Sequence, residues 1–171
     1  MSKRTAGTTA RDWWPTPEKA VAPLLRCLAP QTVFIEPCGG DGALVRILEA
    51  AGHICSYACD IDPRHDSVEW NDALLFTTEP HETVITNPPF ESRLLVPLLH
   101  HWLKSKSAAW LLLPSDSLMN VWFAPFAAAV RTIAPIGRVS WLANGQGGKD
   151  NHAWVRFDFD RGGTGLLLPR C

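Results

Sequence analysis

The sequence has no hydrophobic run long enough to cross a bilayer, which requires about 20 consecutive apolar residues. The longest apolar stretches, such as 108–114, have the length of a strand. The basic residues near the start, Lys3, Arg4 and Arg11, are not followed by an apolar segment, so we expect no secretory signal. These absences favour a cytoplasmic protein with no membrane partner.

Cysteine lacks the spacing of a disulfide framework or a zinc site. The five cysteines are an odd number at irregular intervals. His53, Cys55 and Cys59 lie close together, but no second pair of ligands follows them, and we therefore predict no metal. A reduced protein with buried thiols is expected.

The sequence also lacks an excess of basic residues. Sixteen Lys and Arg against 17 Asp and Glu give a formal net charge of −1. Proteins that bind nucleic acids displace counterions with basic surface, so this balance argues against a nucleic-acid partner. It does not exclude one, because a neutral total can hide a basic face, and arginine, which pairs well with phosphate, outnumbers lysine.

The size and composition are those of one globular domain. The chain has 171 residues, of which 46% are hydrophobic and 19% are charged. The small, polar and basic segment 1–11 predicts a disordered tail, and 12–171 a single domain. No internal repeat or interdomain linker is evident.

Helical and strand patterns alternate along the chain. The predicted helices cover 17–28, 43–51, 94–103 and 117–131, and the predicted strands cover 32–35, 53–58, 67–70, 82–86, 108–113, 138–142 and 152–160. Thr16 is expected to cap the first helix, with Pro17 at its first position. The alternation predicts an α/β fold with a doubly wound, mainly parallel seven-stranded sheet. The glycine-rich stretch 144–148 predicts an antiparallel hairpin at the C-terminus.

The four residues Asn87-Pro88-Pro89-Phe90 directly follow an apolar strand pattern. The Asn87 side-chain oxygen and the Pro88 carbonyl could grip both hydrogens of an aromatic amine and localise its lone pair. The prolines fix the backbone, and Phe90 offers a face on which a planar base could stack. The alternative interpretation is a strand followed by a Pro-Pro turn with a core phenylalanine.

Acids and glycines follow the preceding strands, at the sheet edge where such folds bind ligands. Gly40 and Gly42 would allow close backbone approach at the first strand–helix turn. Glu36 could meet an ammonium group, Asp60 a ribose, and Asp72 an adenine amine. Each acid could instead be a solvated loop carboxylate. A nicotinamide dehydrogenase is a rival, but the Gly-x-Gly-x-x-Gly spacing is absent.

With these motifs, 13–159 resembles the amino-group methyltransferases that modify adenine N6 in DNA, particularly small phage-type members. The resemblance implies a class I methyltransferase (Rossmann-like) catalytic domain, the cofactor S-adenosylmethionine, and DNA as partner. The catalytic residues implied are Asn87, Pro88, Pro89 and Phe90. The implied cofactor-binding residues are Trp14, Thr16, Glu36, Pro37, Cys38, Gly40, Gly42, Asp60, Ile61, Asp72 and Ala73.

Several points stay open. Members that read a DNA sequence usually carry an additional recognition region, which is not evident here, so little sequence selectivity is expected. The same catalytic turn occurs in enzymes that methylate RNA adenine or a protein glutamine amide. A non-catalytic subunit that binds S-adenosylmethionine is a further alternative. The oligomeric state is not predicted.

Overall fold

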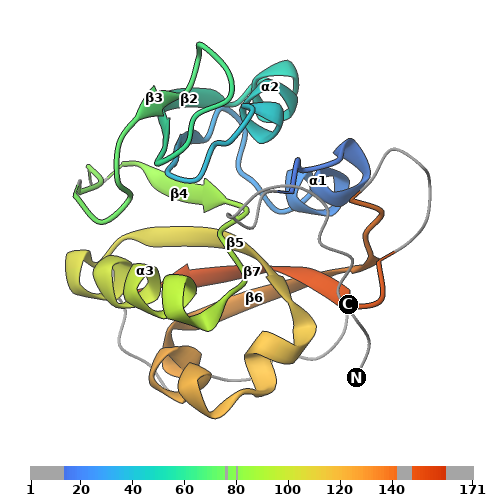
Figure 1. Cartoon of the computed structure of the whole chain (residues 1–171), viewed down its shortest axis with the longest axis vertical. Coiled ribbons are helices and arrows are strands. Elements are labelled where there is room, and N and C mark those ends of the chain that lie inside the picture. The colour runs from blue at the N-terminus through green and yellow to red at the C-terminus, as the bar shows by residue number, and fades with distance from the viewer. Residues whose placement is uncertain (1–13, 76, 80, 142–147, 161–171) are drawn as a thin grey trace.

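The computed structural model describes residues 14–75, 77–79, 81–141 and 148–160 (Figure 1). The predicted tail over 1–11 and most of the predicted loop over 144–148 lie outside these residues. The elements described are α1 (Glu18–Leu25), β1 (Val33–Glu36), α2 (Ala43–Ala50), β2 (Ile54–Asp60), β3 (Glu69–Trp70), β4 (Thr83–Thr86), α3 (Ser92–Ser105), β5 (Ala108–Pro114), the 3-10 helices η1 (Ser115–Met119) and η2 (Val121–Ala129), β6 (Val130–Arg138) and β7 (Asn151–Asp158).

The strands form one seven-stranded sheet in the order β3-β2-β1-β4-β5-β7-β6. The pairs β2–β3, β1–β2, β1–β4 and β4–β5 are parallel, whereas β7 runs antiparallel to both β5 and β6. The prediction of a doubly wound, mainly parallel α/β sheet with an antiparallel C-terminal hairpin is confirmed.

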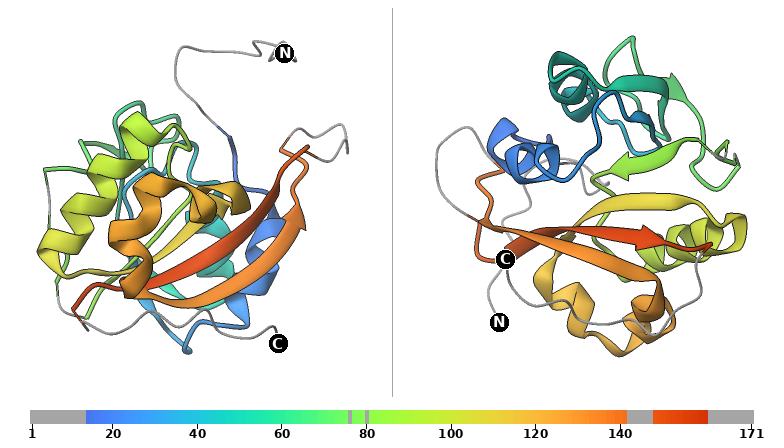
Figure 2. Two further views of the ribbon diagram at one scale, coloured as in Figure 1. Left: turned by 90° about the horizontal axis from the view of Figure 1, so that it is seen from below. Right: turned by 180° about the vertical axis from the view of Figure 1, so that it is seen from behind.

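Helices cover both faces of the sheet (Figure 2). Alternate residues of β5 point to opposite faces. Leu111 and Leu113 pack with α3 and η2 in one core cluster, whereas Trp110 and Leu112 pack with α1 and α2 in the other. β5 is therefore buried on both faces, which explains its continuous apolar sequence.

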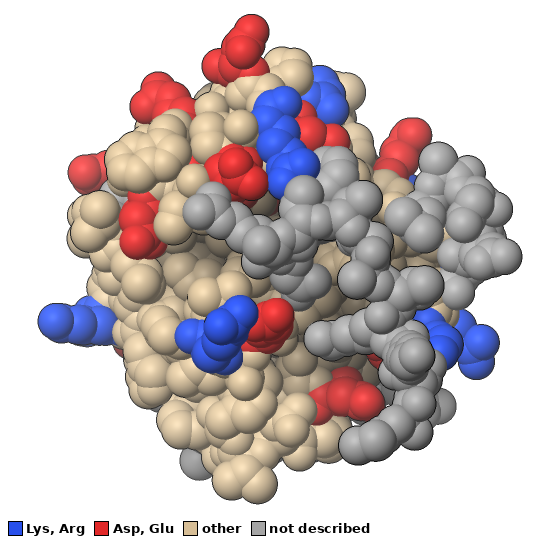
Figure 3. All heavy atoms as spheres, viewed as in Figure 1, with Lys and Arg blue, Asp and Glu red and all other residues tan. Residues whose placement is uncertain are grey.

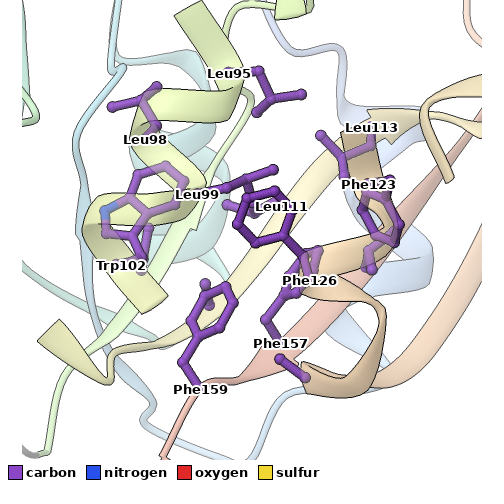
Figure 4. Close-up of a cluster of buried hydrophobic side chains, with 14 of the residues drawn as sticks. Leu95, Leu98, Leu99, Trp102, Leu111, Leu113, Phe123, Phe126, Phe157 and Phe159 are labelled. Atoms are coloured by element: carbon purple, nitrogen blue, oxygen red, sulfur yellow. The ribbon is translucent and has the colours of Figure 1, made fainter. Parts of the chain in front are cut away.

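The cluster between α3, η2 and the sheet contains many large side chains (Figure 4). Leu95, Leu99 and Trp102 recur at helical spacing on the buried face of α3. Phe126 and Phe157 complete the cluster from η2 and β7, and both are fully buried. Burial of each such side chain contributes about 1.5–3 kcal/mol, so this cluster anchors the C-terminal half of the sheet.

The predicted helix over 117–131 is wrong. The chain instead forms the two 3-10 helices and enters β6 at Val130. Pro125 explains part of the difference, because proline has no N–H to donate and its ring clashes with the carbonyl four residues earlier. Val130, Thr132 and Ile133 then pair with β7, with a register shift between Val130 and Thr132.

The predicted strand over 138–142 is also misplaced, because β6 ends at Arg138. β6 contains Pro135 and Gly137, which are unfavourable inside a strand. They are tolerated because β6 is the edge strand and its register shifts between these residues.

Three smaller predictions need correction. Helix α1 begins at Glu18 with Pro17 at the N-cap, and no side chain caps it, so Thr16 has another role. Helix α3 begins at Ser92, so Pro97 lies inside it and does not start it. Cys27 is exposed, contrary to the expectation of buried thiols.

Candidate active site

A cavity of about 270 Å³ lies at the carboxyl ends of β1, β2 and β4. This volume is close to the lower end of the usual range for ligand pockets, about 300–1,000 Å³. The predicted site residues that line it are Trp14, Thr16, Glu36, Pro37, Cys38, Gly40, Asp60, Ile61, Asp72, Ala73, Asn87 and Pro89. The predicted site residues that do not line it are Gly42, Pro88 and Phe90.

The Asn87 amide is held in one orientation. Its Nδ2 donates to the Trp14 carbonyl oxygen at 3.1 Å and to Thr16 Oγ1 at 3.2 Å. A carbonyl oxygen can only accept, so the Trp14 contact requires the nitrogen of the amide on that side. The opposite atom, Oδ1, is buried and has no hydrogen-bond partner among the described residues. An unpaired buried acceptor costs about 1–3 kcal/mol, so Oδ1 calls for an explanation, which a ligand that donates to it would supply.

Glu36 is a buried carboxyl group at the end of β1, with 1% of its surface exposed. Its Oε1 accepts a hydrogen bond from Thr86 Oγ1 at 3.1 Å, whereas Oε2 has no partner among the described residues. Burial raises the pKa of Glu36 well above its ordinary value; hydrogen bonds from Thr86 and from the Asn87 backbone oppose the rise. A cation in the cavity would favour the charged form of Glu36 and so lower its pKa again.

Asp60 joins the two turns that border the cavity. Its Oδ2 accepts from the Gly40 N–H at 2.9 Å and its Oδ1 from the Asp62 N–H at 2.8 Å. Each carboxylate oxygen has a second lone pair, so Asp60 can still accept hydrogen bonds from a ligand.

Gly42 acts on the shape of the turn rather than on the cavity surface. It is the N-cap of α2, has φ +71°, and donates its N–H to the Gly39 carbonyl at 2.7 Å. A side chain there would be strained by that φ and would meet Arg46 Nη1 and Ser67 Oγ at 3.2 Å.

The far wall of the cavity mixes an apolar and an acidic surface. Ile61 is 51% exposed, unusual for so large an apolar side chain, and faces the cavity. Asp72 lines the same region and accepts from the Leu74 N–H at 2.9 Å. Cys38 is a partly exposed lining residue, and burial of its thiol raises its pKa well above the ordinary value, so it stays protonated.

Nine lining residues are not among the predicted site residues. These are Pro15, Gly39, Asp41, Leu44, Asp62, Arg64, Leu74, Leu94 and Leu98. The helical spacing of Leu94 and Leu98 could have placed them on one face of α3, and Leu44 follows the glycine turn closely. Nothing in the sequence distinguishes Arg64, which contacts Asp62 at 3.2 Å, from other surface arginines.

Phe90 lies in an aromatic cluster beside the cavity, together with Trp14, Trp141 and His152. The ring centroid of Phe90 lies 5.8 Å from that of Trp141 and 5.4 Å from that of His152. Trp141 also lies 6.2 Å from Trp14 and 5.1 Å from His152. The strand register explains the position of His152, because it pairs with Pro114 at the carboxyl end of β5.

The described part of the chain has neither a cluster of metal ligands nor a helix that could span a membrane. It contains no group of three or more His, Cys, Asp or Glu placed to hold a metal ion. None of its helices is both long and apolar enough to span a membrane.

No known family model matches the chain, and no curated protein matches its sequence. Several solved structures share its fold. A provisionally assigned RNA methyltransferase from Pyrococcus horikoshii is similar with a TM-score of 0.70 and 14% identity, over 91% of this chain and 92% of that chain. The 23S rRNA methyltransferase ErmE is similar with a TM-score of 0.56 and 15% identity, over 85% of this chain and 69% of that chain. A dimethyladenosine transferase from Plasmodium falciparum is similar with a TM-score of 0.54 and 16% identity, over 85% of this chain and 62% of that chain. The chain therefore has the class I methyltransferase fold.

Proposed function

We propose that the protein is an S-adenosylmethionine-dependent methyltransferase acting on the N6 amino group of adenine in DNA. The observation that carries this proposal is the amide of Asn87, a residue that lines the cavity: its buried Oδ1 has no partner among the described residues, while its Nδ2 is fixed by two acceptors. An amide held in this way is ready to accept a hydrogen bond without reorganising.

The reaction needs such an acceptor because the adenine amine is a poor nucleophile. Asn87 Oδ1 would accept one amine hydrogen and the Pro88 carbonyl the other, which localises the lone pair on nitrogen. Both acceptors stabilise the positive charge that develops on this nitrogen. Phe90 would stack on the base.

The cavity residues fit the cofactor's charge. The acidic residues that line it are Glu36, Asp41, Asp60, Asp62 and Asp72, and the basic one is Arg64. This surplus of carboxylates suits a ligand that carries a sulfonium and an ammonium group. S-adenosylmethionine would supply an activated methyl group, with Glu36 facing its ammonium, Asp60 its ribose, and Ile61 and Asp72 its adenine.

The acceptor base has to leave a duplex to reach Asn87. The amine of a stacked and paired adenine lies inside the duplex, so it cannot enter the cavity that Asn87 lines. We therefore propose a flipped or single-stranded base as the substrate.

The surface supports loose binding of the nucleic-acid backbone. On the face seen in Figure 3, described lysines and arginines lie interspersed with acidic residues rather than in one continuous patch. The formal net charge of −1 agrees with this. We propose weak, salt-sensitive contacts to phosphate and little sequence selectivity.

RNA adenine is the second candidate acceptor. The neighbours from P. horikoshii and ErmE are described as RNA methyltransferases, and a shared fold leaves the acceptor open. The pocket chemistry proposed for Asn87 is the same for either nucleic acid.

The test is incubation of the protein with methyl-labelled cofactor and, separately, single-stranded DNA, duplex DNA, RNA or total protein. Digestion to nucleosides and chromatography would identify the product, with Asn87→Ala as the negative control. We expect N6-methyladenine from DNA, most rapidly from single strands. Label found only in RNA would move the proposal to the second candidate, and label found only in protein, or in no acceptor, would overturn both.

A further inference from the structure

We infer that Trp141 is a positioning residue of the active site, whose indole connects the two segments that meet at Asn87. This inference rests on the proposed function for its catalytic meaning, but its structural part can be tested separately. Trp141 belongs to none of the predicted motifs, and it lies 54 positions after Asn87 in the sequence.

The first connection runs through Trp14. The indoles of Trp14 and Trp141 lie 6.2 Å apart with an interplanar angle of 53°. The carbonyl oxygen of Trp14 accepts one of the two hydrogen bonds that orient the Asn87 amide. Trp14 precedes α1 and belongs to no helix or strand, so the packing of its indole against Trp141 contributes to the position of its backbone.

The second connection runs through Phe90. Its ring lies 5.8 Å from that of Trp141 at 60°, and both rings contact His152. His152 is buried, and its Nδ1 lies 3.0 Å from the Asp150 carbonyl oxygen. Tilted rings at these distances are in favourable contact, but they leave no room for a base between them. Trp141 therefore packs against the Phe90 ring, and in the proposed function only Phe90 stacks on the base.

The backbone around Trp141 is itself fixed. The Gly148 N–H donates to the Val139 carbonyl oxygen at 2.7 Å, which closes the chain on both sides of the indole. A Cβ on Gly148 would lie 2.8 Å from that oxygen and 3.6 Å from Trp141 Cδ1. Gly148 is thus required for the backbone to pass this close to the Val139 carbonyl, two residues before Trp141.

Trp141→Ala should release Trp14 and Phe90 together. Because small misplacements of catalytic groups can lower rates by about 100-fold, we expect kcat at saturating cofactor and nucleic acid to fall by roughly 10- to 100-fold. Trp141→Phe, which keeps an aromatic ring, should recover most of the rate. Trp122→Ala is the matched control, because Trp122 is also half-buried but packs against the core cluster around α3 and η2.

A readout independent of activity comes from NMR of the Asn87 side-chain amide, assigned by its loss in Asn87→Ala. Its two proton signals should shift in Trp141→Ala and stay in place in Trp122→Ala. Gly148→Ala should move them in the same direction, and this variant serves if Trp141→Ala does not fold.

The inference would be overturned by unmoved Asn87 signals in both Trp141→Ala and Gly148→Ala, or by equal losses of rate in Trp141→Ala and Trp122→Ala that follow the folded fraction. If the wild-type protein methylates no nucleic acid but the Asn87 signals shift as expected, the proposed function fails while the positioning role of Trp141 stands.

Discussion

The carboxyl ends of β1 and β2 carry carboxylates and backbone turns, whereas the neighbouring edge at β4 and β7 carries an amide and aromatic rings. In the acidic region, Asp60 binds the N–H groups of Gly40 and Asp62, so charge and backbone geometry shape the cavity. In the aromatic region, ring contacts at 5.1–6.2 Å surround the segment that orients Asn87.

The two regions also differ in how their residues come together. The acidic region takes its residues from consecutive strand–turn units between Glu36 and Asp72, each close to its own strand end. The aromatic region depends on long-range contacts, such as that between Asn87 and Trp14, which are 73 positions apart. This difference agrees with the proposed function, in which the acidic region would bind the cofactor and the aromatic region would bind the acceptor base. The variants below test this division of labour.

The largest effect should come from Asn87→Ala, which removes the acceptor from the aromatic region. Loss of one preorganised hydrogen-bonding group from an active site typically lowers kcat by about 100- to 1,000-fold, and we expect a fall of this size. The affinity for S-adenosylmethionine, measured by calorimetry, should stay unchanged. Asn71→Ala is the control, because Asn71 Nδ2 donates to the Tyr57 hydroxyl at 3.1 Å and does not line the cavity. Near-normal turnover by Asn87→Ala would show that the turn is only structural.

Asp60→Asn should weaken cofactor binding by about 1.5–3 kcal/mol, roughly 10- to 150-fold, because a charged hydrogen-bond acceptor is lost. The amide oxygen can still accept from one of the two backbone N–H groups. Calorimetry would measure the dissociation constant, with the exposed Asp66→Asn as control. An effect on kcat alone, without a change in cofactor affinity, would contradict the division of labour.

Phe90→Ala should remove the stacking of the base, which usually contributes about 1–3 kcal/mol, and kcat/KM for nucleic acid should fall accordingly. The affinity for the cofactor should stay unchanged. Phe90→Trp should retain most of the activity, because it keeps an aromatic face. If both variants lose turnover in step with their melting temperatures, Phe90 is a packing residue instead.

Glu36→Gln should have the smallest effect, and its size depends on pH. The pKa of Glu36 is raised in the folded protein, so its contribution to stability is fully present below the unfolded pKa and is lost as pH rises through the folded pKa. At neutral pH the variant should therefore melt at a higher temperature than the wild type, and the difference should vanish under acidic conditions.

The same variant tests the acidic region as a cation site. If the cofactor's ammonium lies beside Glu36, binding should release a proton in the wild type below the raised pKa, and affinity should increase with pH. Calorimetry in buffers of different ionisation enthalpy would count the protons. Proton release that persists in Glu36→Gln would assign it to another group.

Much of the acidic region could be predicted from sequence. Glu36, Asp60 and Asp72 each follow a short apolar strand, and parallel strands bring their carboxyl ends to one edge. The structure agrees, since all three residues line one cavity. Gly42 was predicted to contact the cofactor, yet its place is inside the turn, because the sequence cannot tell a glycine needed for φ from one needed for close approach.

The C-terminal part was predicted less well. A helix was expected where the segment that contains Pro125 forms 3-10 turns, and β6 was missed because Pro135 and Gly137 interrupt its pattern. Pairing with β7 overrides these weak local preferences.

The sequence by itself determined the alternation of strands and helices up to β5, the mainly parallel sheet with its closing hairpin, and the strand ends at which acids and the Asn-Pro-Pro-Phe turn lie. These follow from hydrophobic periodicity and turn residues, which act over a few positions. Only the tertiary structure decided that Thr16 binds Asn87 rather than capping a helix, that Oδ1 of Asn87 is left unpaired, and that Trp141 joins Trp14 to Phe90. Those features depend on contacts between residues far apart in the chain, and local sequence preferences contain no information about which distant groups will meet.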